Sequence, residues 1–531
     1  MELGKTNDPE ILEMFRKDKE RREKMKQEPA NIEELKEVLY TAGAEWRNSH
    51  FKENKKTGEI EILPIKPRAV ADILLKYVKF AIIGRSEREL EKAPLVFYDP
   101  GAGIYKNNER LIKGLIYSVE RDLNIRQYKE VLNFLSVGAR TKRPTKNKNL
   151  IVVGNGVYNK HTKTLEPFSP KYAFTTKVQT NYNQEATEPT FNGWRLSDWF
   201  KSLAQGDEHK ERLLWQAIAC TVNPNYTAEA AIFLVDEGQG RTGKSTFERL
   251  LQNITGEGNY SSLKIDEFEN DFKLAHAFGS TLLIGDDNHP DNYNKRSDNF
   301  KSVLTGETIL VNPKGIAPFS ATFNCFVVQS MNGLPRFGDK SDALLRRIRV
   351  IEFNKQYPDT PEGRKIKQEY IKDKRLLEWC LKQALELDFD ILEDTEESKR
   401  NIYDIKLDND PVVYFVENYF GEITSDRIPV VFLFKYFLNT MTYENNPQTM
   451  KQNTFTRRLK PILEAKGWTY SRNNLAPGKY WNEEDKKLLA KYGAPFEDRT
   501  LEIDVKKKVP LFECSKKKKP LTGKKLKKQQ N

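Results

Sequence analysis

One segment, residues 231–246, constrains the fold more than any other part of the chain. It reads AIFLVDEGQGRTGKST, in which an apolar run precedes Gly238, Gly243, Lys244 and Ser245 in the spacing G-x-x-x-x-G-K-[ST]. The apolar run predicts a buried strand, and TFERLLQNI after the motif predicts a helix. A strand, a glycine-rich loop and a helix in this order are the context in which such a motif binds phosphate. The segment therefore predicts an α/β core.

The residue types in this loop suit the chemistry of a bound nucleoside triphosphate. Glycines tolerate positive φ, so they let backbone N–H groups curl around phosphate oxygens. Lys244 can reach the β- and γ-phosphates, Ser245 can ligate Mg²⁺, and the helix from Thr246 presents its N-terminus to the anion. We therefore predict ATP and Mg²⁺ as cofactors. The predicted nucleotide contacts are Gly238, Gly240, Gly243, Lys244, Ser245 and Thr246.

An acidic element follows further along the chain. The run from Ser280 to Asp287 reads STLLIGDD, an apolar strand that ends in two carboxylates. Alone, this pair could be a solvated strand end, but its separation from Lys244 matches the second acidic element of an ATPase. We predict that Asp286 holds Mg²⁺, directly or through water. Asp287 is predicted to orient and deprotonate the attacking water.

A third apolar run also ends in polar residues. FNCFVVQS, at 323–330, predicts a strand and is followed by Met331, Asn332 and Gly333. A polar side chain at the end of this strand would lie between the acidic and the phosphate-binding elements. Asn332 is therefore predicted to sense the γ-phosphate and to position water. A simple Asn-Gly turn is the alternative.

Three arginines flank a further apolar strand, RVIEF. They are Arg346, Arg347 and Arg349. An arginine at this place can reach the nucleotide of a neighbouring subunit and stabilise charge in the transition state. We favour Arg346 and Arg347 for this role. Surface salt bridges are the alternative, and at least one of the three is expected to form one.

Composition narrows the class of protein. The 531 residues contain no apolar run long enough to span a membrane, and the charged N-terminus lacks a signal-peptide core, which predicts a cytoplasmic protein. The four cysteines form no C-x-x-C pair, so neither a disulfide framework nor a zinc site is expected. The net charge of +12 favours a polyphosphate partner, although the lysine-rich C-terminal segment supplies much of it. Without an N-K-x-D signature, a GTPase is not expected.

The order of these elements resembles superfamily 3 helicases, in particular the helicase half of phage and plasmid primase-helicases related to the poxvirus primase-helicase. The resemblance extends over about residues 90–500. Its specific part comprises the phosphate loop with Asp286, Asp287, Lys301, Thr305, Gly306 and Asn332. It implies an AAA+ type fold, a hexameric homo-oligomeric ring around DNA, and ATP bound between subunits with an arginine supplied in trans. A phage or mobile-element protein of this kind would act in the bacterial cytosol.

The family also places DNA contacts in a hairpin between the acidic strand and the asparagine strand. Here ILV, then Asn312-Pro-Lys314-Gly, then IAPF predicts strand, turn and strand. Lys314 at the tip could grip backbone phosphate, and Lys301 is the second predicted DNA contact of this region. An exposed turn lysine is the alternative for Lys314. For Phe319, packing is favoured over base stacking.

The C-terminal part resembles a winged helix. PVVYFVENYF and VVFLFKYFLNTM predict two helices, and a third from Thr454 to Ala465 carries Arg457 and Arg458, which are predicted to contact DNA phosphates. A strand from Gly467 and a wing through Trp481 complete the pattern, and a domain that only packs on the motor is the alternative. The domain prediction is 1–30 charged arm, 31–149 α+β region, 150–205 helicase-associated segment, 206–385 AAA+ ATPase, 386–504 winged-helix-like domain and 505–531 basic tail.

Longer members of the family carry a primase domain, whose D-x-D site is not recognisable in the first 140 residues. We therefore expect a motor that works with a separate primase or polymerase. The leading hypothesis is an ATP-dependent DNA helicase that translocates on single-stranded DNA and opens forked DNA. An AAA+ initiator or loader that uses ATP as an assembly switch is the alternative. A packaging or transposition ATPase is disfavoured because no nuclease-type carboxylate cluster lies outside the motor.

Overall fold

The computed structural model describes residues 27–53, 60–91, 93–236, 238, 240–289, 293–294, 296–314, 318–338, 342–475, 483–495 and 508–514, together with Arg16 and Glu23. The chain forms two compact units. The first unit comprises 1–335 and 346–399, and the second comprises 336–345 and 400–531. Most of the predicted charged arm at 1–30, the predicted wing through Trp481 and residues 515–531 of the predicted tail lie outside the described residues.

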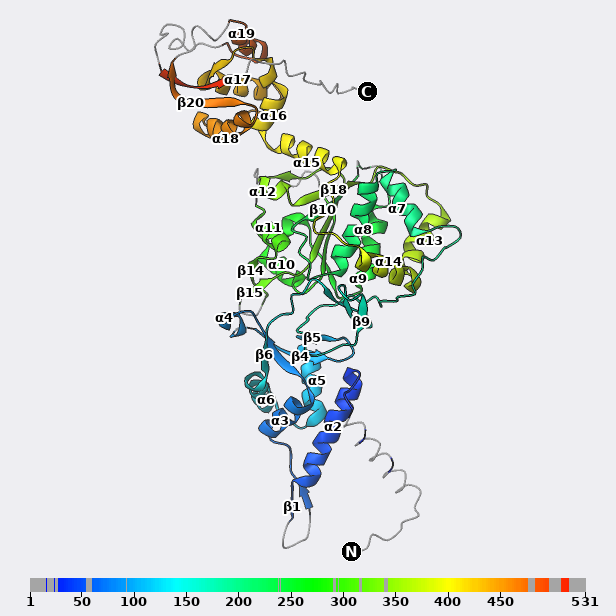
Figure 1. Cartoon of the computed structure of the whole chain (residues 1–531). Helices are drawn as coiled ribbons and strands as arrows, with labels where there is room; N and C mark the ends of the chain where they lie inside the picture. Colours follow the sequence, from blue (N-terminus) through cyan, green and yellow to red (C-terminus); the bar gives the residue numbers. More distant parts are fainter. Residues whose placement is uncertain are drawn as a thin grey trace. The chain divides into compact units, whose positions relative to one another are not determined.

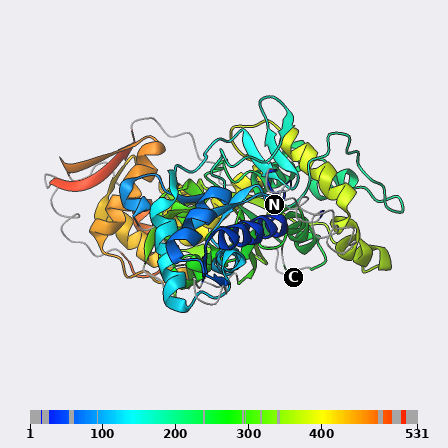
Figure 2. The same cartoon turned by 90° about the horizontal axis from the view of Figure 1, so that it is seen from below.

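Among its described residues, the first unit begins with four helices of at least 11 residues beside a four-stranded sheet (Figures 1 and 2, blue to cyan). The helices are α2 (Ile32–Ser49), α3 (Pro67–Tyr77), α5 (Glu109–Val119) and α6 (Ile125–Gly138). The sheet has the order β5 (Ile104–Lys106), β4 (Leu95–Asp99), β3 (Phe80–Ile83) and β6 (Arg140–Lys142). Helix α5 illustrates why these segments fold together, because its apolar residues recur at helical spacing and are all buried: Ile112, Leu115, Ile116 and Val119.

A small antiparallel sheet connects this part to the centre of the unit. It consists of β7 (Leu150–Val153), β8 (Gly156–Asn159) and β9 (Thr164–Glu166). Ile151 and Tyr158 belong to the same buried cluster as the central helices. The Thr180 hydroxyl, in the chain that leaves this sheet, donates to the Ile254 carbonyl at 2.7 Å. The predicted helicase-associated segment is therefore packed against the centre of the first unit.

The centre of the first unit is a five-stranded parallel sheet. Its order is β11 (Tyr260–Ser262), β12 (Leu282–Asn288), β16 (Phe326–Met331), β10 (Ala231–Val235) and β18 (Ile348–Glu352). All five residues of β10 are buried, as expected for a parallel strand covered on both faces. The surrounding helices include α7 (Leu196–Ala204), α8 (Glu208–Val222), α9 (Lys244–Thr255) and α14 (Lys374–Glu386). The α/β core predicted from residues 231–246 is confirmed.

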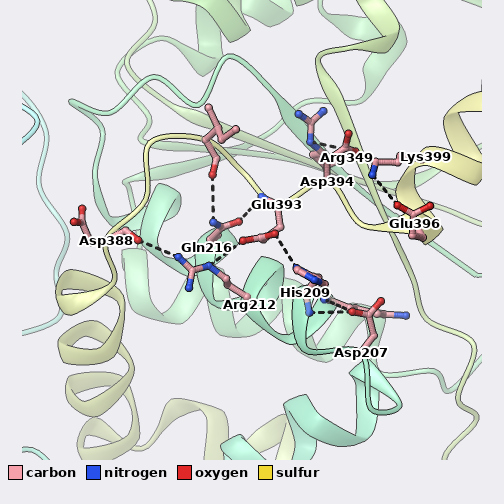
Figure 3. Close-up of polar contacts among 12 residues, drawn as sticks. Asp207, His209, Arg212, Gln216, Arg349, Asp388, Glu393, Asp394, Glu396 and Lys399 are labelled. Atoms are coloured by element: carbon pink, nitrogen blue, oxygen red, sulfur yellow. Dashed lines mark hydrogen bonds and ion pairs between the residues drawn. The ribbon is translucent and has the colours of Figure 1, made fainter.

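The chain after α14 remains attached to the first unit as far as residue 399. Figure 3 shows how side chains of α8 hold it. Arg212 forms an ion pair with Glu393 at 3.0 Å and donates to the Asp388 carbonyl at 3.1 Å. Gln216 accepts from the Glu393 backbone N–H at 2.7 Å. The first unit therefore extends beyond 385, where the sequence prediction ended the ATPase.

The second unit has its own core and a three-stranded antiparallel sheet. Its main helices are α16 (Pro411–Asn418), α17 (Val430–Tyr443), α18 (Gln452–Ala465) and α19 (Glu483–Tyr492). The sheet has the order β19 (Arg427–Pro429), β21 (Lys508–Cys514) and β20 (Trp468–Leu475). Three buried phenylalanines, Phe415, Phe437 and Phe455, meet at ring-centroid distances of 4.8–6.1 Å. The two predicted helices and the third, basic one are present.

Two details of the second unit differ from the sequence prediction. Thr454 was expected to cap the third helix, but α18 begins at Gln452 and its N-cap residue is Lys451. Residues 508–514 were expected in a basic tail, but they form the central strand of the sheet. The cause is visible in the residues themselves, since Leu511 and Phe512 are fully buried and the lysines around them masked this short apolar strand.

No helix among the described residues combines the length and apolar character needed to cross a membrane.

Candidate active site

The loop between β10 and α9 has the backbone geometry that its glycines predicted. Gly238, Gly240 and Gly243 have φ values of 78°, 63° and 92°. Gly243 is also the N-cap of α9, so the first N–H groups of that helix open into the loop. A Cβ atom built on Gly238 or Gly240 would meet nothing within 4 Å. Space is therefore open beside these two glycines, and Thr246 lies in the first turn of α9.

Asp236 holds this loop in place, and the sequence analysis did not single it out. It is 4% exposed and follows β10 directly. One carboxylate oxygen accepts from the Gly238 N–H at 3.1 Å, and the other accepts from the Thr242 hydroxyl at 3.0 Å. Its second oxygen also lies 3.4 Å from the Lys244 ammonium. The sequence signal that could have identified Asp236 is an acidic residue placed between the apolar strand and the glycines of the loop.

Lys244 connects the loop to the neighbouring strand. Its side chain is 11% exposed. The ammonium donates to the Met331 carbonyl at 2.8 Å and to the Asn332 side-chain oxygen at 2.7 Å. The structure therefore brings Lys244 and Asn332 into direct contact, as expected for residues that follow adjacent parallel strands.

The acidic residues lie at an irregularity of β12. The pairing of β12 with β16 shifts between Gly285 and Asn288, so Asp286 and Asp287 form a bulge, and Asp287 has a positive φ of 53°. Both carboxylates are exposed. Asp286 accepts from the Ser330 hydroxyl at 3.1 Å. Bulges commonly redirect side chains next to active sites, and here the bulge carries two consecutive exposed carboxylates near the end of β12.

A buried amide network fixes this bulge, and sequence reasoning missed it. Asn288 donates to the Gly285 carbonyl at 2.9 Å, to the Gln329 side chain at 3.0 Å and to the Ser330 carbonyl at 3.1 Å. It also accepts from the Ile265 N–H at 2.9 Å. A Cβ on Gly285 would stand 2.0 Å from the Gln329 side-chain oxygen, so only glycine fits there. These long-range contacts have no signature in the local sequence.

Two further ionisable groups, Glu248 and Lys367, face the same edge. Glu248 lies on α9 and is 3% exposed, and its Oε1 atom has no hydrogen-bond partner. Burial, followed by the charge of Asp286, raises the pKa of Glu248 to about 7. The Lys367 ammonium, on α13 (Pro361–Gln368), donates to the Ser245 hydroxyl at 2.8 Å. Burial and then the charge of Arg249 lower the pKa of Lys367.

The residues present fit a nucleotide with a divalent cation. The open loop, the N-terminus of α9 and Lys244 form a cradle for phosphate. Within the described residues, no group of three or more His, Cys, Asp or Glu side chains could hold a metal alone. Ser245 and Asp286 offer two oxygens, and Mg²⁺ in proteins is commonly bound by one or two protein ligands plus substrate phosphates and water.

The arginines after β16 differ in their surroundings. Arg346 is exposed and Arg347 is partly buried. Arg349 donates to the Arg346 and Ile348 carbonyls at 2.9 and 3.1 Å and lies 3.9 Å from Asp394, a pair visible in Figure 3. Arg349 thus forms the internal salt bridge expected of one of the three. Arg346 and Arg347 remain the predicted arginines for a neighbouring subunit.

A hairpin is present, formed by β14 (Thr308–Val311) and β15 (Phe319–Thr322), which pair antiparallel, and its second strand begins at Phe319, where the predicted strand IAPF ends. Lys314 is exposed in the turn between them. Phe319 contacts the Phe278 ring edge-on at 5.6 Å, which supports packing rather than base stacking. Lys301, on α11 (Asp298–Thr305), lies 3.5 Å from Asp298, so its ammonium is engaged within its own helix.

The two arginines of α18 also differ. Arg457 is exposed. Arg458 pairs with Asp410, the residue whose side chain caps the N-terminus of α16. This ion pair joins two helices of the core, so Arg458 has a structural role that the DNA-contact prediction did not anticipate. Arg457 remains a predicted phosphate contact.

Three family models match separate parts of the chain. Residues 23–199 match the family described as D5 N terminal like, and residues 407–493 match the family described as Poxvirus D5 protein-like. The chain belongs to the D5-like family of phage and viral primase-helicases. The relation to the poxvirus primase-helicase predicted from sequence is thereby confirmed. Residues 237–347 of this D5-like protein, which hold the candidate site, match a family of unknown function, DUF5906.

Solved structures give weaker matches. An apo structure of the C-terminal region of NrS-1 is 12% identical to this D5-like chain, with a TM-score of 0.46. The match covers 83% of this chain and 94% of the NrS-1 chain. A second apo structure of that region is 12% identical, with a TM-score of 0.45, and covers 77% and 96% of the two chains.

Proposed function

We propose that this D5-like protein is an ATP-driven DNA helicase of phage or viral replication. The observation that carries the proposal is the convergence of three elements at the carboxyl ends of adjacent parallel strands. The loop after β10 carries Lys244, β16 ends next to Asn332, and the bulge of β12 carries Asp286 and Asp287. In open parallel sheets, ligands bind outside this edge. The strand order, with β16 between β10 and β12, supports an AAA+ type core.

Each residue of the site has a task in hydrolysis. The loop N–H groups and Lys244 bind and orient the phosphates. Ser245 and Asp286 would hold Mg²⁺, which supplies charge neutralisation at the transferring phosphoryl group. Asp287 accepts the proton of the attacking water, and Asn332 orients that water. Its hydrogen bond with Lys244, the proposed phosphate-binding lysine, supports this assignment of Asn332.

The remaining assignments follow from exposure and charge. Arg346 and Arg347 are proposed to reach the nucleotide of a neighbouring subunit in a hexameric ring. Lys314, exposed at the hairpin turn, is proposed to grip the backbone of single-stranded DNA. The second unit, in which α16, α17 and α18 accompany an antiparallel sheet, is proposed to be a winged-helix-like domain in which Arg457 contacts DNA phosphate.

One experiment tests the proposal directly. ATP hydrolysis is measured with and without single-stranded DNA, alongside strand displacement on a forked duplex, for the wild type and for Lys244→Ala. The helicase assignment requires turnover that DNA stimulates, displacement of the strand, and loss of both in Lys244→Ala. Turnover without displacement contradicts the helicase assignment and points to an initiator or loader that binds DNA without unwinding it.

A further inference from the structure

The hydroxyl that should ligate a metal is already engaged by a lysine from another part of the chain. Ser245 receives a hydrogen bond from the Lys367 ammonium at 2.8 Å. The two residues are far apart in sequence, and neither motif spacing nor the match of family models marks Lys367. An ammonium bonded to this hydroxyl occupies one of the positions that a cation coordinated by Ser245 would need.

The position of Lys367 is built into the fold. Helix α13 begins at Thr360, whose hydroxyl accepts from the Gly363 N–H at 3.0 Å, and it leads into the buried turn η2 (Tyr370–Lys372). Asn253 on α9 donates to the Ile371 carbonyl in that turn at 2.9 Å. This bond fixes the end of α13 against the helix that carries Ser245, so the contact does not depend on a freely moving surface side chain.

The negative groups around Lys367 are those of the candidate metal site. Lys367 interacts electrostatically with Asp286 and with Glu248. Glu248 is buried on α9, three residues after Ser245, and its Oε1 atom has no hydrogen-bond partner. A buried carboxylate oxygen without a partner is costly unless a cation or a donor reaches it at some stage. One oxygen of Glu248 therefore lies buried beside Lys367 without a hydrogen-bond donor.

We propose that Lys367 is the internal counter-ion of the metal site, which occupies Ser245 and faces Asp286 and Glu248 until a metal-nucleotide complex is bound. The proposal rests on the proposed function, since it assumes that Ser245 and Asp286 are metal ligands. Its consequence is competition, because Lys367 must leave the Ser245 hydroxyl before that hydroxyl can ligate a metal. Lys367 would thus set the concentration of Mg²⁺ at which the protein retains nucleotide.

Binding of a fluorescent ADP analogue, titrated with MgCl₂ from an EDTA-containing start, measures this competition without turnover. Lys367→Met removes the competing charge and is expected to lower the Mg²⁺ concentration for half-maximal binding about fivefold. This is the size of effect expected from one unit charge close to a bound cation near the protein surface. Lys367→Arg keeps the charge and should remain close to the wild type. Lys365→Met, an exposed lysine of the same helix, is the matched control and should stay within about twofold of it.

A second variant should change the Mg²⁺ requirement in the opposite direction, so the inference can be tested even if Lys367→Met does not fold. At pH 8, above the raised pKa of Glu248, Glu248→Gln removes negative charge beside Lys367 and is expected to raise the required Mg²⁺ concentration about fivefold. An unchanged or raised Mg²⁺ requirement in Lys367→Met overturns the inference. Weaker binding of the analogue by Lys367→Met than by the wild type in EDTA also overturns it, because Lys367 would then be a phosphate contact. If the wild type binds no analogue under any condition, the proposed function falls and this inference falls with it.

Discussion

Asp287 combines two properties that single it out among the carboxylates of the site. It has a positive φ within a strand bulge, and its side chain is exposed. Backbone strain of this kind persists where surrounding contacts impose it, and here the Asn288 amide network does so. The contacts of Asn288 therefore hold the backbone of Asp287 in the bulge.

Replacement of Asp287 by asparagine should separate binding from hydrolysis. The shape is kept, but the side chain can no longer accept a proton, so ATP turnover should fall about 10²–10⁴-fold with nucleotide affinity nearly unchanged. Steady-state turnover and analogue binding are measured on the same preparation. Asp271→Asn, an exposed carboxylate at the start of α10 (Asp271–Ala277), is the control. Normal hydrolysis by Asp287→Asn would show that another group accepts the proton.

Glu248 is expected to make the free energy of unfolding depend on pH. Because burial raises its folded-state pKa from 4.5 to about 7, the protonated form stabilises the fold. That contribution is fully present below about pH 4.5 and is lost as the pH rises through about 7.

Glu248→Gln should therefore raise the unfolding midpoint more at pH 8 than at pH 5.5, by the equivalent of roughly 1–3 kcal/mol. Thermal unfolding at the two pH values measures it. The exposed Glu257→Gln serves as control. An equal effect of Glu248→Gln at both pH values would contradict the raised pKa.

Which residues could be predicted from sequence depends on how far their partners lie along the chain. Lys244 and Ser245 belong to a local motif whose spacing carries its own physics, and Asp286 follows an apolar strand. Lys367 and Asn288 act through partners far away in sequence, and a lone lysine or asparagine in a polar stretch has no local signature. Sequence therefore indicates the residues that bind phosphate better than those that hold them in place.

At the scale of elements, strands were easier to predict than their irregularities. The strand ending at Val235 and the first strand of the hairpin lie where the apolar runs placed them, because buried strands have strong local patterns. The second strand of the hairpin runs from Phe319 to Thr322, later than the predicted IAPF. The bulge of β12 was not anticipated, since it depends on Gln329 of the neighbouring strand. Strand β21 was missed because its short apolar stretch lies among lysines.

The hairpin formed by β14 and β15 supplies a prediction at this scale. Lys314 is exposed at its turn and is remote in sequence from the phosphate loop. Lys314→Ala should leave basal ATP turnover within about twofold and reduce strand displacement about tenfold or more, with a weaker salt dependence of DNA binding. Lys79→Ala, an exposed lysine before β3, is the control. Wild-type displacement by Lys314→Ala would exclude the hairpin as the DNA grip.

At the scale of the whole molecule, a shared site predicts complementation between inactive subunits. Lys244→Ala lacks the phosphate contact, and Arg346→Ala lacks the proposed arginine in trans. In a mixed ring, some sites combine an intact Lys244 with an intact Arg346 from the adjacent copy, and only those sites regain activity. ATP turnover of mixtures should therefore exceed that of either variant alone. Turnover that remains at the level of the two separate variants would argue for a site completed within one chain.

The position of strand β21 also determines when the second unit can fold during translation. Translation releases N-terminal segments first. In the described sheet, β19 and β20 each hydrogen-bond to β21, the strand between them and the last to be synthesised. The parallel sheet of the first unit is complete once Glu352 has emerged, whereas the C-terminal sheet must wait for Cys514. Until then, the apolar face of a half-built unit is exposed on the nascent chain, and such exposed apolar surface and unpaired strand edges favour aggregation.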